Sequence, residues 1–340
     1  MIRELIDRNE HQILCVLLPE GSQSEFDRGR MRRFFALSRY HRECRRTYCT
    51  PLRMTDSIKR LSERNDIPVR YVGELTPQLF SEDIISTESD LLLLAGGWPR
   101  KIQPLVYDSP KYGAINIHPS LLPNYRGTSV HRWQILNGEQ ISGVSIHRLG
   151  EEYDSGEMLI SQKFELEPDE LPQTLTKKAA VVAASIIHEG ISLSAQPPNE
   201  PLNEISNSPA YALWKWSDDE RFRINWEKPA KEIECFIRAS TQESYRYIGP
   251  WTLLASNRWI IRKAREIKRD ISEEADVGSL SLRDDGRVLV ICGGNTALEL
   301  LQIQSEKRNK RTGSGLHPQE LFKIRKTSTL KFLSNPSFDC

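Results

Sequence analysis

Short apolar runs alternate with amphipathic stretches over the first half of the chain. Four of the runs have the length and composition of buried strands: 12–18, 68–72, 90–95 and 114–118. Apolar residues recur at helical spacing over three longer stretches: 57–65, 129–137 and 171–193. This alternation predicts an α/β fold, in which a mostly parallel, Rossmann-like sheet carries helices on both faces. Ligands bind such sheets beyond the carboxyl ends of the strands.

The second half of the chain has a different pattern. Proline, asparagine and serine fill 196–209 without periodicity, which is typical of an interdomain linker. After a helix expected at 230–239, alternating apolar runs predict strands that include 259–261, 288–291 and 298–300. We therefore predict four regions: a catalytic domain over 1–195, a linker over 196–209, a small β-rich domain over 210–330 and a tail over 331–340.

Two polar side chains interrupt the buried run at 114–118. Asn116 and His118 are two residues apart, so they share one face of a strand, and Asp154 follows in the motif Tyr-Asp-Ser-Gly. Acyl transfer to an amine needs donors for the developing oxyanion and a base for the amine proton. We predict that Asn116 and a protonated His118 stabilise the oxyanion. Asp154 is expected to orient His118, to favour its charged form and to relay the proton through water.

The same residues belong to a longer set of motifs. Four segments resemble the 10-formyltetrahydrofolate-dependent formyltransferases: Asn-Ile-His-Pro-Ser-Leu-Leu-Pro-Asn-Tyr-Arg-Gly (116–127), Asn-Gly-Glu (137–139), Gly-Val-Ser-Ile-His (143–147) and Asp-Ser-Gly (154–156). The resemblance extends from about residue 91 to about residue 175 and places Asn116, His118 and Asp154 on the family's catalytic trio. It implies 10-formyltetrahydrofolate as the one-carbon donor, with no metal.

The resemblance also implies where the folate binds. The strand at 90–95 runs into Gly-Gly-Trp-Pro-Arg-Lys-Ile (96–102), which resembles one wall of the family's pterin pocket. Trp98 and Ile102 would supply apolar surface, while backbone amides near Gly97 and Arg100 would read the pterin edge. The loop at 150–155 is the other expected wall, with Gly150 and Tyr153 as its candidate residues.

The resemblance also leads to an expectation for each end of the chain. The family begins with a strand, a glycine-bearing turn and a helix, whereas residues 1–6 here have the pattern of the end of that helix. We therefore expect an amino-terminal truncation of roughly 15 to 25 residues, from the usual length of a βα unit. The region 210–330 resembles the open-barrel, OB-like domain of methionyl-tRNA and sugar-nucleotide formyltransferases, through 218–226 and 235–239. Residues 240–247 depart from the pattern because they lack its prolines.

Residues around the site also bear on the identity of the amine acceptor. Tyr125 and Arg126 are expected at the mouth of the site, and Trp133 and His147 resemble the sugar-nucleotide enzymes more than the tRNA enzymes, which usually carry methionine where His147 stands. The leading prediction is therefore the amino group of a nucleotide-linked amino sugar. Methionyl-tRNA is the alternative, because 28–46 holds eight arginines interleaved with aromatic residues. A solvated amphipathic helix would have the same composition. A third alternative is a non-catalytic relative or inactive fragment.

Composition bears on the partners of the protein, its cellular compartment and its metal sites. The formal net charge of +1 gives no global attraction to nucleic acid or to a membrane, and no apolar run approaches the roughly 20 residues that cross a bilayer. The six cysteines contain no Cys-x-x-Cys pair, which predicts reduced thiols in a cytoplasmic protein. His41, Cys44 and Cys49 lack a fourth ligand nearby, so we reject a zinc site there. The sequence leaves open whether the protein forms a homodimer.

Overall fold

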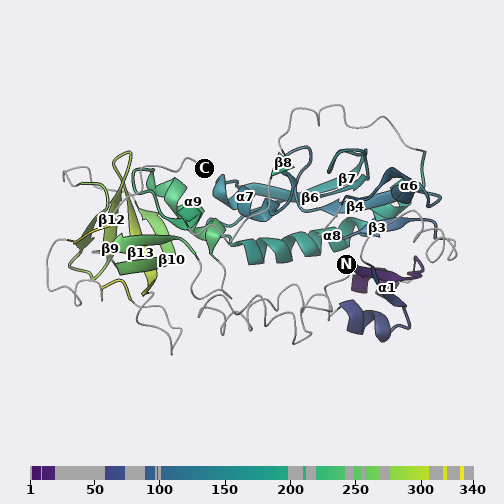
Figure 1. Ribbon diagram of the computed structural model, residues 1–340, viewed down its shortest axis with the longest axis horizontal. Helices are drawn as coiled ribbons and strands as arrows, with labels where there is room; N and C mark the ends of the chain where they lie inside the picture. Colours follow the sequence, from purple (N-terminus) through teal and green to yellow (C-terminus); the bar gives the residue numbers. More distant parts are fainter. Residues whose placement is uncertain are drawn as a thin grey trace. The chain divides into compact units, whose positions relative to one another are not determined.

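The computed structural model describes residues 2–8, 10–19, 58–72, 89–95, 98, 101–197, 210–211, 220–241, 249–254, 257–267, 276–305, 317–319 and 330–332 (Figure 1). The chain divides into two compact units. The first comprises Met1–Val130, Ile141–Glu165 and Thr176–Ala212, and the second His131–Gln140, Leu166–Leu175 and Leu213–Cys340. Each unit is treated separately below.

The strands of the first unit form two main sheets. β1 (Val16–Pro19) pairs in parallel with β2 (Val69–Val72). The other sheet has the order β3-β4-β6-β7, with β3 at Leu92–Leu94, β4 at Ala114–His118, β6 at Ile141–Arg148 and β7 at Met158–Glu165. A short parallel bridge joins β5 (Arg126–Gly127) to β8 (Ala210–Tyr211).

The sheet of the first unit changes direction across β4. β3 and β4 run in parallel, as predicted, whereas β6 is antiparallel to β4 and β7 is antiparallel to β6. The short connection 149–157 accounts for the second antiparallel pair, because a parallel pair would need a crossover of a dozen residues or more. The first unit is therefore an α/β, Rossmann-like domain whose parallel pairs, β1–β2 and β3–β4, are accompanied by an antiparallel extension.

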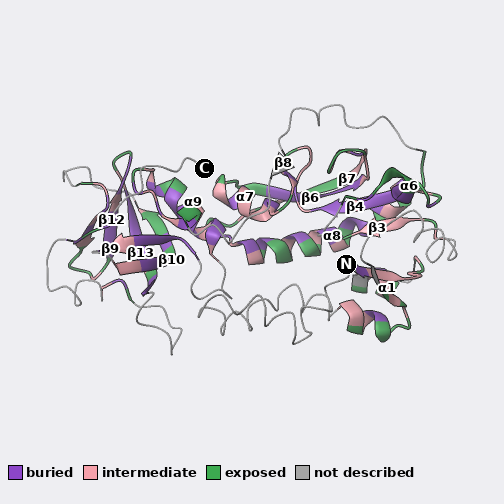
Figure 2. Cartoon of the chain, in the orientation of Figure 1, coloured by how far each residue is buried: buried purple, intermediate pink, exposed green. Residues whose placement is uncertain are grey.

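Helix α8 (Pro172–Ser194) lies along this sheet and builds the core of the first unit (Figure 1). Its buried Ala183, Ile186 and Ile187 pack in one cluster with Ile115 of β4 and Ile146 of β6. β4 and β6 are almost entirely buried (Figure 2), so their polar side chains need partners inside the protein. The remaining described helices of this unit are α1 (Ile2–Arg8), a turn of helix at 58–63, and α6 (Pro104–Tyr107).

The second unit is built on an antiparallel, barrel-like sheet. Its order is β14-β11-β12-β13-β10-β9, with β9 at Trp251–Leu254, β10 at Asn257–Ile267, β11 at Ser279–Leu282, β12 at Val288–Cys292, β13 at Thr296–Ser305 and β14 at Leu330–Lys331. Helix α9 (Ala230–Ser240), the short turn η5 (Glu220–Phe222) and most of α7 (Val130–Leu136) belong to the same unit.

Trp226 holds the core of the second unit together. It is fully buried, stacks on Phe332 with ring centroids 5.2 Å apart, and donates its indole N–H to Thr252 Oγ1 at 2.9 Å. Burying a large aromatic side chain together with a satisfied polar atom stabilises a small barrel efficiently. The β-rich second domain expected from the sequence is therefore confirmed as a fold.

Several sequence predictions concern residues that the structure does not describe. They are the linker beyond Pro197, the arginine-rich segment 28–46, the candidate ligands His41, Cys44 and Cys49, and the loop beyond Thr241. Within the described part of the chain, none of the helices has the length and apolar character needed to cross a membrane. Cys15, Cys235 and Cys292 carry free thiols.

Candidate active site

The pairing of β4 with β6 brings the first polar residues together. Asn116 lies opposite His147 in the antiparallel register, and His118 lies opposite Ser145. Both histidines are almost fully buried, with 4% and 1% of their surface exposed. Because alternate residues of a strand share a face, Asn116 and His118 direct their side chains to the same side of the sheet. The position of His147 beside Asn116 follows from the strand pairing and could not be read from the sequence.

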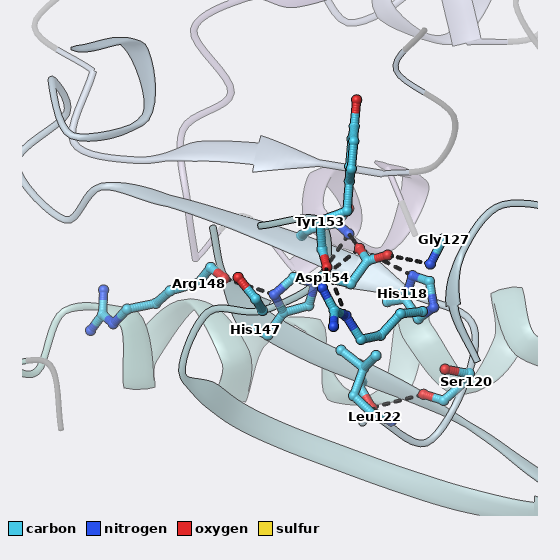
Figure 3. A network of polar contacts seen from close by, with 12 residues as sticks. His118, Ser120, Leu122, Gly127, His147, Arg148, Tyr153 and Asp154 are labelled. Carbon is cyan, nitrogen blue, oxygen red and sulfur yellow. Dashed lines mark hydrogen bonds and ion pairs between the residues drawn. The ribbon is translucent and has the colours of Figure 1, made fainter. Parts of the chain in front are cut away.

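Asp154 reaches this pair from the connection between β6 and β7 (Figure 3). Its backbone is in the left-handed region, with φ of 52°, which a non-glycine residue adopts only when its surroundings hold it there. Arg126 supplies that support, since its Nε and Nη2 atoms both donate to the carbonyl oxygen of Tyr153, at 2.9 and 2.6 Å. The amide of Gly127 donates to Asp154 Oδ2 at 2.7 Å.

The other carboxylate oxygen of Asp154 is the meeting point of the site. Oδ1 lies 3.4 Å from Nδ1 of His118 and 3.6 Å from Nε2 of His147, and it accepts a hydrogen bond from the Asn116 amide nitrogen at 3.3 Å. The structure therefore brings all three predicted catalytic residues together around one atom. It adds His147 as a fourth member of the cluster, a residue that the sequence analysis had placed among the substrate contacts.

Backbone carbonyls fix the tautomers of the two histidines. His147 Nδ1 lies 2.7 Å from the carbonyl oxygen of Arg148, so Nδ1 carries the proton and Nε2 accepts from Asn116 Nδ2 at 3.2 Å. His118 Nε2 donates in the same way to the carbonyl of Tyr125 at 2.7 Å. When His118 is neutral, its Nδ1 lone pair therefore lies on the side of Asp154.

The surroundings lower the pKa values of both Asp154 and His118, but for different reasons. Burial alone raises the pKa of Asp154, but the contacts of the carboxylate with His147, His118 and the Gly127 amide together outweigh it and lower the pKa to about 2. Burial lowers the pKa of His118 and outweighs the opposing effect of Asp154. Asp154 thus favours the charged form of His118, as predicted, whereas burial favours the neutral form.

This arrangement predicts that the protein loses stability in mild acid. Above pH 6.5, the ordinary histidine pKa, His118 is neutral in the folded and unfolded chains alike. Below it, the unfolded chain binds the proton more strongly, so the free energy of unfolding falls as the pH drops toward the lowered folded pKa. The contribution of Asp154 is present above 3.8 and is lost as the pH falls toward 2. Urea unfolding between pH 6.5 and 3.8 should therefore show a smaller decline in His118→Gln, and equal declines would contradict it.

Ser145 supports the motif from the neighbouring strand. Its hydroxyl donates to the carbonyl of Ser120 at 2.7 Å and accepts from the amide of Leu122 at 3.1 Å. The Ser120 hydroxyl in turn donates to the carbonyl of Asn124 at 2.7 Å. These bonds satisfy the backbone where β4 ends and the chain turns. The sequence carried a signal for Ser145, a small polar residue within a buried strand, but no signal for its partners.

Gly156 closes the loop that carries Asp154. A Cβ atom at this position would lie 1.9 Å from the carbonyl oxygen of Arg148, which no backbone can accommodate without moving. We expect Gly156→Ala to reduce the free energy of unfolding by about 2 kcal/mol or more, the scale of steric overpacking. The measurement is urea unfolding. Glu152→Ala, at an exposed position of the same loop, is the control and should change stability little, whereas an equal loss in both variants would contradict this role of Gly156.

The predicted folate residues have several locations. Trp98 packs against the hydrophobic cluster that contains the buried Ile102, so both contribute to the core beside α6. Tyr153 is 55% exposed, its ring points away from the Asp154 carboxylate (Figure 3), and Lys101 Nζ lies 5.9 Å from the ring centroid. Gly150 packs closely on Ser155 and Gly156. Gly97 and Arg100 lie outside the described residues.

The residues predicted to contact the acceptor also differ in what the structure shows for them. The carbonyl of Tyr125 orients His118, and this residue has a left-handed backbone, with φ of 59°. Arg126 is buried, and its hydrogen bonds to the Tyr153 carbonyl hold the loop that carries Asp154. Trp133 lies on α7, in the second unit. Its role at the acceptor stays a prediction.

Known proteins carry related sequences and folds. The Formyl transferase family model matches residues 57–191, and the Formyl transferase C-terminal domain model matches 217–317. A methionyl-tRNA formyltransferase from Chlorobium chlorochromatii is 30% identical over 254 residues, which cover 74% of this chain and 77% of that protein. One from Bacillus velezensis is 27% identical over 263 residues, or 75% and 78% of the two chains.

Two solved structures extend the likeness to the fold. The sugar 3N-formyltransferase WlaRD superposes with a TM-score of 0.51 at 17% identity, over 74% of this chain and 82% of its own. An N-formyltransferase from Helicobacter canadensis, solved with folinic acid and dTDP-3-aminofucose, gives 0.51 at 17%, over 72% and 81%. With both family models matched and a 30% identical relative covered over most of its length, the chain belongs to the formyltransferase family and is a folate-dependent formyl-transferring enzyme.

Proposed function

We propose that the enzyme transfers the formyl group of 10-formyltetrahydrofolate to a primary amine at the Asn116–His118–Asp154 cluster. The observation that carries this proposal is the convergence of an amide donor, an imidazole and a carboxylate on one oxygen atom, Asp154 Oδ1, inside a buried site. Such a set can stabilise an oxyanion and move a proton within the same small volume. Family membership supports the folate co-substrate.

Asn116 is the proposed oxyanion donor. Its amide nitrogen faces His147 Nε2 at 3.2 Å and Asp154 Oδ1 at 3.3 Å, and these two acceptors lie only 3.6 Å apart. One N–H can therefore point between them, which leaves the second N–H for a substrate oxygen. The surrounding bonds fix the amide before the reaction begins, and a donor that needs no reorientation is the kind that lowers a barrier most.

His118 is the proposed proton carrier. Burial lowers the pKa of His118 and so favours the neutral ring, whose Nε2–H bond to Tyr125 leaves the Nδ1 lone pair available. As the amine nitrogen forms a bond to the formyl carbon, its proton passes to Nδ1, directly or through a water molecule. The imidazolium then pairs with Asp154 at 3.4 Å, and the proton moves to the folate nitrogen as the bond from that nitrogen to the formyl carbon breaks.

The folate is proposed to lie against the loops that end at Ile102 and begin at Gly150. Tyr153, exposed beside the catalytic loop, is the proposed contact from the second wall, and Trp98 the proposed apolar contact from the first. Gly97 and Arg100 complete the proposed set through their backbone amides. Substrate pockets of this kind are mostly apolar with a few placed polar groups.

A nucleotide-linked amino sugar is the proposed acceptor. His147 carries this choice, because it is buried in the catalytic cluster and holds both Asn116 and Asp154, and the motif around it resembles the sugar-nucleotide enzymes. Tyr125 and Trp133 are the proposed sugar or nucleotide contacts. Methionyl-tRNA is the second candidate, favoured by relatives such as that of Chlorobium chlorochromatii.

His147→Met tests the part played by His147. Methionine cannot donate to Arg148 and accepts only weakly from Asn116, so the amide and carboxylate lose an orienting partner. We expect kcat/KM to fall about tenfold, the effect of one positioning interaction worth about 1.4 kcal/mol. Unchanged kcat/KM would contradict the role assigned to His147. His317→Gln, at an exposed histidine of the second unit, is the matched control.

The acceptor is tested by competition. Tetrahydrofolate release is followed with a panel of nucleotide-linked amino sugars and with methionyl-tRNA, at equal enzyme concentration. A sugar with kcat/KM at least tenfold above that of methionyl-tRNA supports the leading proposal, and the reverse order replaces it with the second candidate. Silence with every acceptor would favour the non-catalytic alternative over both.

A further inference from the structure

A second cluster of chemically active side chains lies in the first unit, among residues that the proposed mechanism does not use. Glu10 and His11 lie between α1 and β1, and His188 lies on α8. One ligand atom from each of the three lies within 4.8 Å of the others. His188 Nδ1 is 3.2 Å from Glu10 Oε2, and the two imidazole rings face each other with centroids 5.3 Å apart.

Three imidazole nitrogens of this cluster have no hydrogen-bond partner among the described residues. His188 is 7% exposed, and neither of its ring nitrogens has such a partner within the described chain. The buried Nε2 of His11 likewise has no hydrogen-bond partner among the described residues. Buried polar atoms nearly always find a partner, because leaving one unsatisfied costs about 1–3 kcal/mol. His188 Nδ1 has only its ion pair with Glu10, so one nitrogen of each ring can take a ligand that the described residues do not supply.

We propose that Glu10, His11 and His188 bind a divalent transition-metal ion of the zinc type. Two imidazoles and one carboxylate are ligands that Zn²⁺ accepts, whereas Mg²⁺ and Ca²⁺ require oxygen ligands. Bonds of about 2.0–2.2 Å place neighbouring ligands of a tetrahedral ion about 3.3 Å apart, close to the 3.2 Å between His188 and Glu10. A ring nitrogen of His11 lies within 4.8 Å of both other ligand atoms, so this side chain would move toward them to complete the set.

The exposure of the cluster leaves room for a fourth ligand. The side chain of Glu10 is 54% exposed, while that of His188 is 9% exposed, so the site opens to solvent on the Glu10 side. A water molecule can take the remaining position. The ion would join the segment before β1 to α8, two elements far apart in the sequence. Its binding energy would therefore add to the stability of the first unit.

The experiment uses the full chain after removal of metal with a chelator. Zn²⁺ is titrated calorimetrically, Mg²⁺ serves as the hard-cation comparison, and Co²⁺ reports the coordination geometry through its visible absorption. The variants are Glu10→Gln, His11→Gln and His188→Gln. Glu10→Gln alters a half-exposed side chain, so it keeps the test valid if His188→Gln folds poorly. His317→Gln and the double variant Cys44→Ser, Cys49→Ser are the controls for other thiol and imidazole sites.

We expect one equivalent of Zn²⁺ to bind, with the dissociation constant raised at least tenfold in Glu10→Gln and in His11→Gln and unchanged in both controls. Zn²⁺ should also raise the thermal midpoint of the wild type but not of these two variants. Equal affinity in wild type and variants would overturn the assignment by locating the ion elsewhere. Absence of saturable one-to-one binding would overturn it too, and would leave Glu10 and His188 as a plain ion pair.

Discussion

Asparagine in place of Asp154 is expected to lower turnover by about 100-fold or more, the usual scale for a positioned acid–base group. The substitution keeps the size of the side chain and an oxygen that can accept from the Gly127 amide. It removes the negative charge 3.4 Å from His118 Nδ1, the only described carboxylate in contact with that ring. His118, whose pKa burial already lowers, would then have no counter-ion when it takes the amine proton.

The measurement is tetrahydrofolate release at saturating acceptor, with both KM values determined in parallel. Because Asp154 is assigned to the proton transfer, the loss should appear mainly in kcat. Glu152→Gln, which removes a carboxylate from an exposed position of the same loop, should leave turnover within a factor of about two. A kcat near normal in Asp154→Asn would refute the role given to this carboxylate.

Glutamine in place of His118 is expected to lower turnover by a similar factor, about 100-fold or more. Glutamine can still donate to the Tyr125 carbonyl, so the fold of the 118–125 segment should persist. It has no titratable nitrogen to accept the proton of the amine. Since the wild-type pKa of His118 is lowered, the acid limb of its kcat profile should lie below pH 6.5, and this limb should vanish in His118→Gln.

A matched pair of variants separates chemistry from folding in this experiment. His317→Gln removes an exposed histidine of the second unit and should leave both turnover and the pH profile unchanged. Circular dichroism of His118→Gln at pH 7.5 should match the wild type, because both chains are neutral at this position. Residual turnover within tenfold of the wild type would remove His118 from the proposed proton path.

Several strands and helices of both units could be predicted because each has a strong local pattern. The strand at 114–118 and the helices near 171–193 and 230–239 were found within about a residue of their bounds, since long periodic runs leave little ambiguity. The strand expected at 12–18 begins instead at Val16. Residues 13–15 carry apolar side chains but pair with no strand in the described part of the chain, and pairing is not written in the local sequence.

The sequence predicted which residues form the site, but it did not predict the hydrogen bonds among them. The strand spacing of Asn116 and His118 indicated a shared face, and the resemblance added Asp154. The clamp of Arg126 on the Tyr153 carbonyl and the place of His147 beside Asn116 arise from strand register and loop closure, which depend on contacts distant in sequence. The lowered pKa of His118 could not be predicted for a similar reason, because the burial of this side chain comes from the whole core.

The measurement that tests the central claim most directly is the transfer of labelled formyl from 10-formyltetrahydrofolate to an amine. Isotope-labelled donor is incubated with the enzyme and the acceptor panel, and the products are identified by mass. The account predicts an N-formylated amine, formed at the same rate as tetrahydrofolate and lost in Asp154→Asn and His118→Gln. Tetrahydrofolate release without a formylated amine, or product from either variant at the wild-type rate, would contradict it.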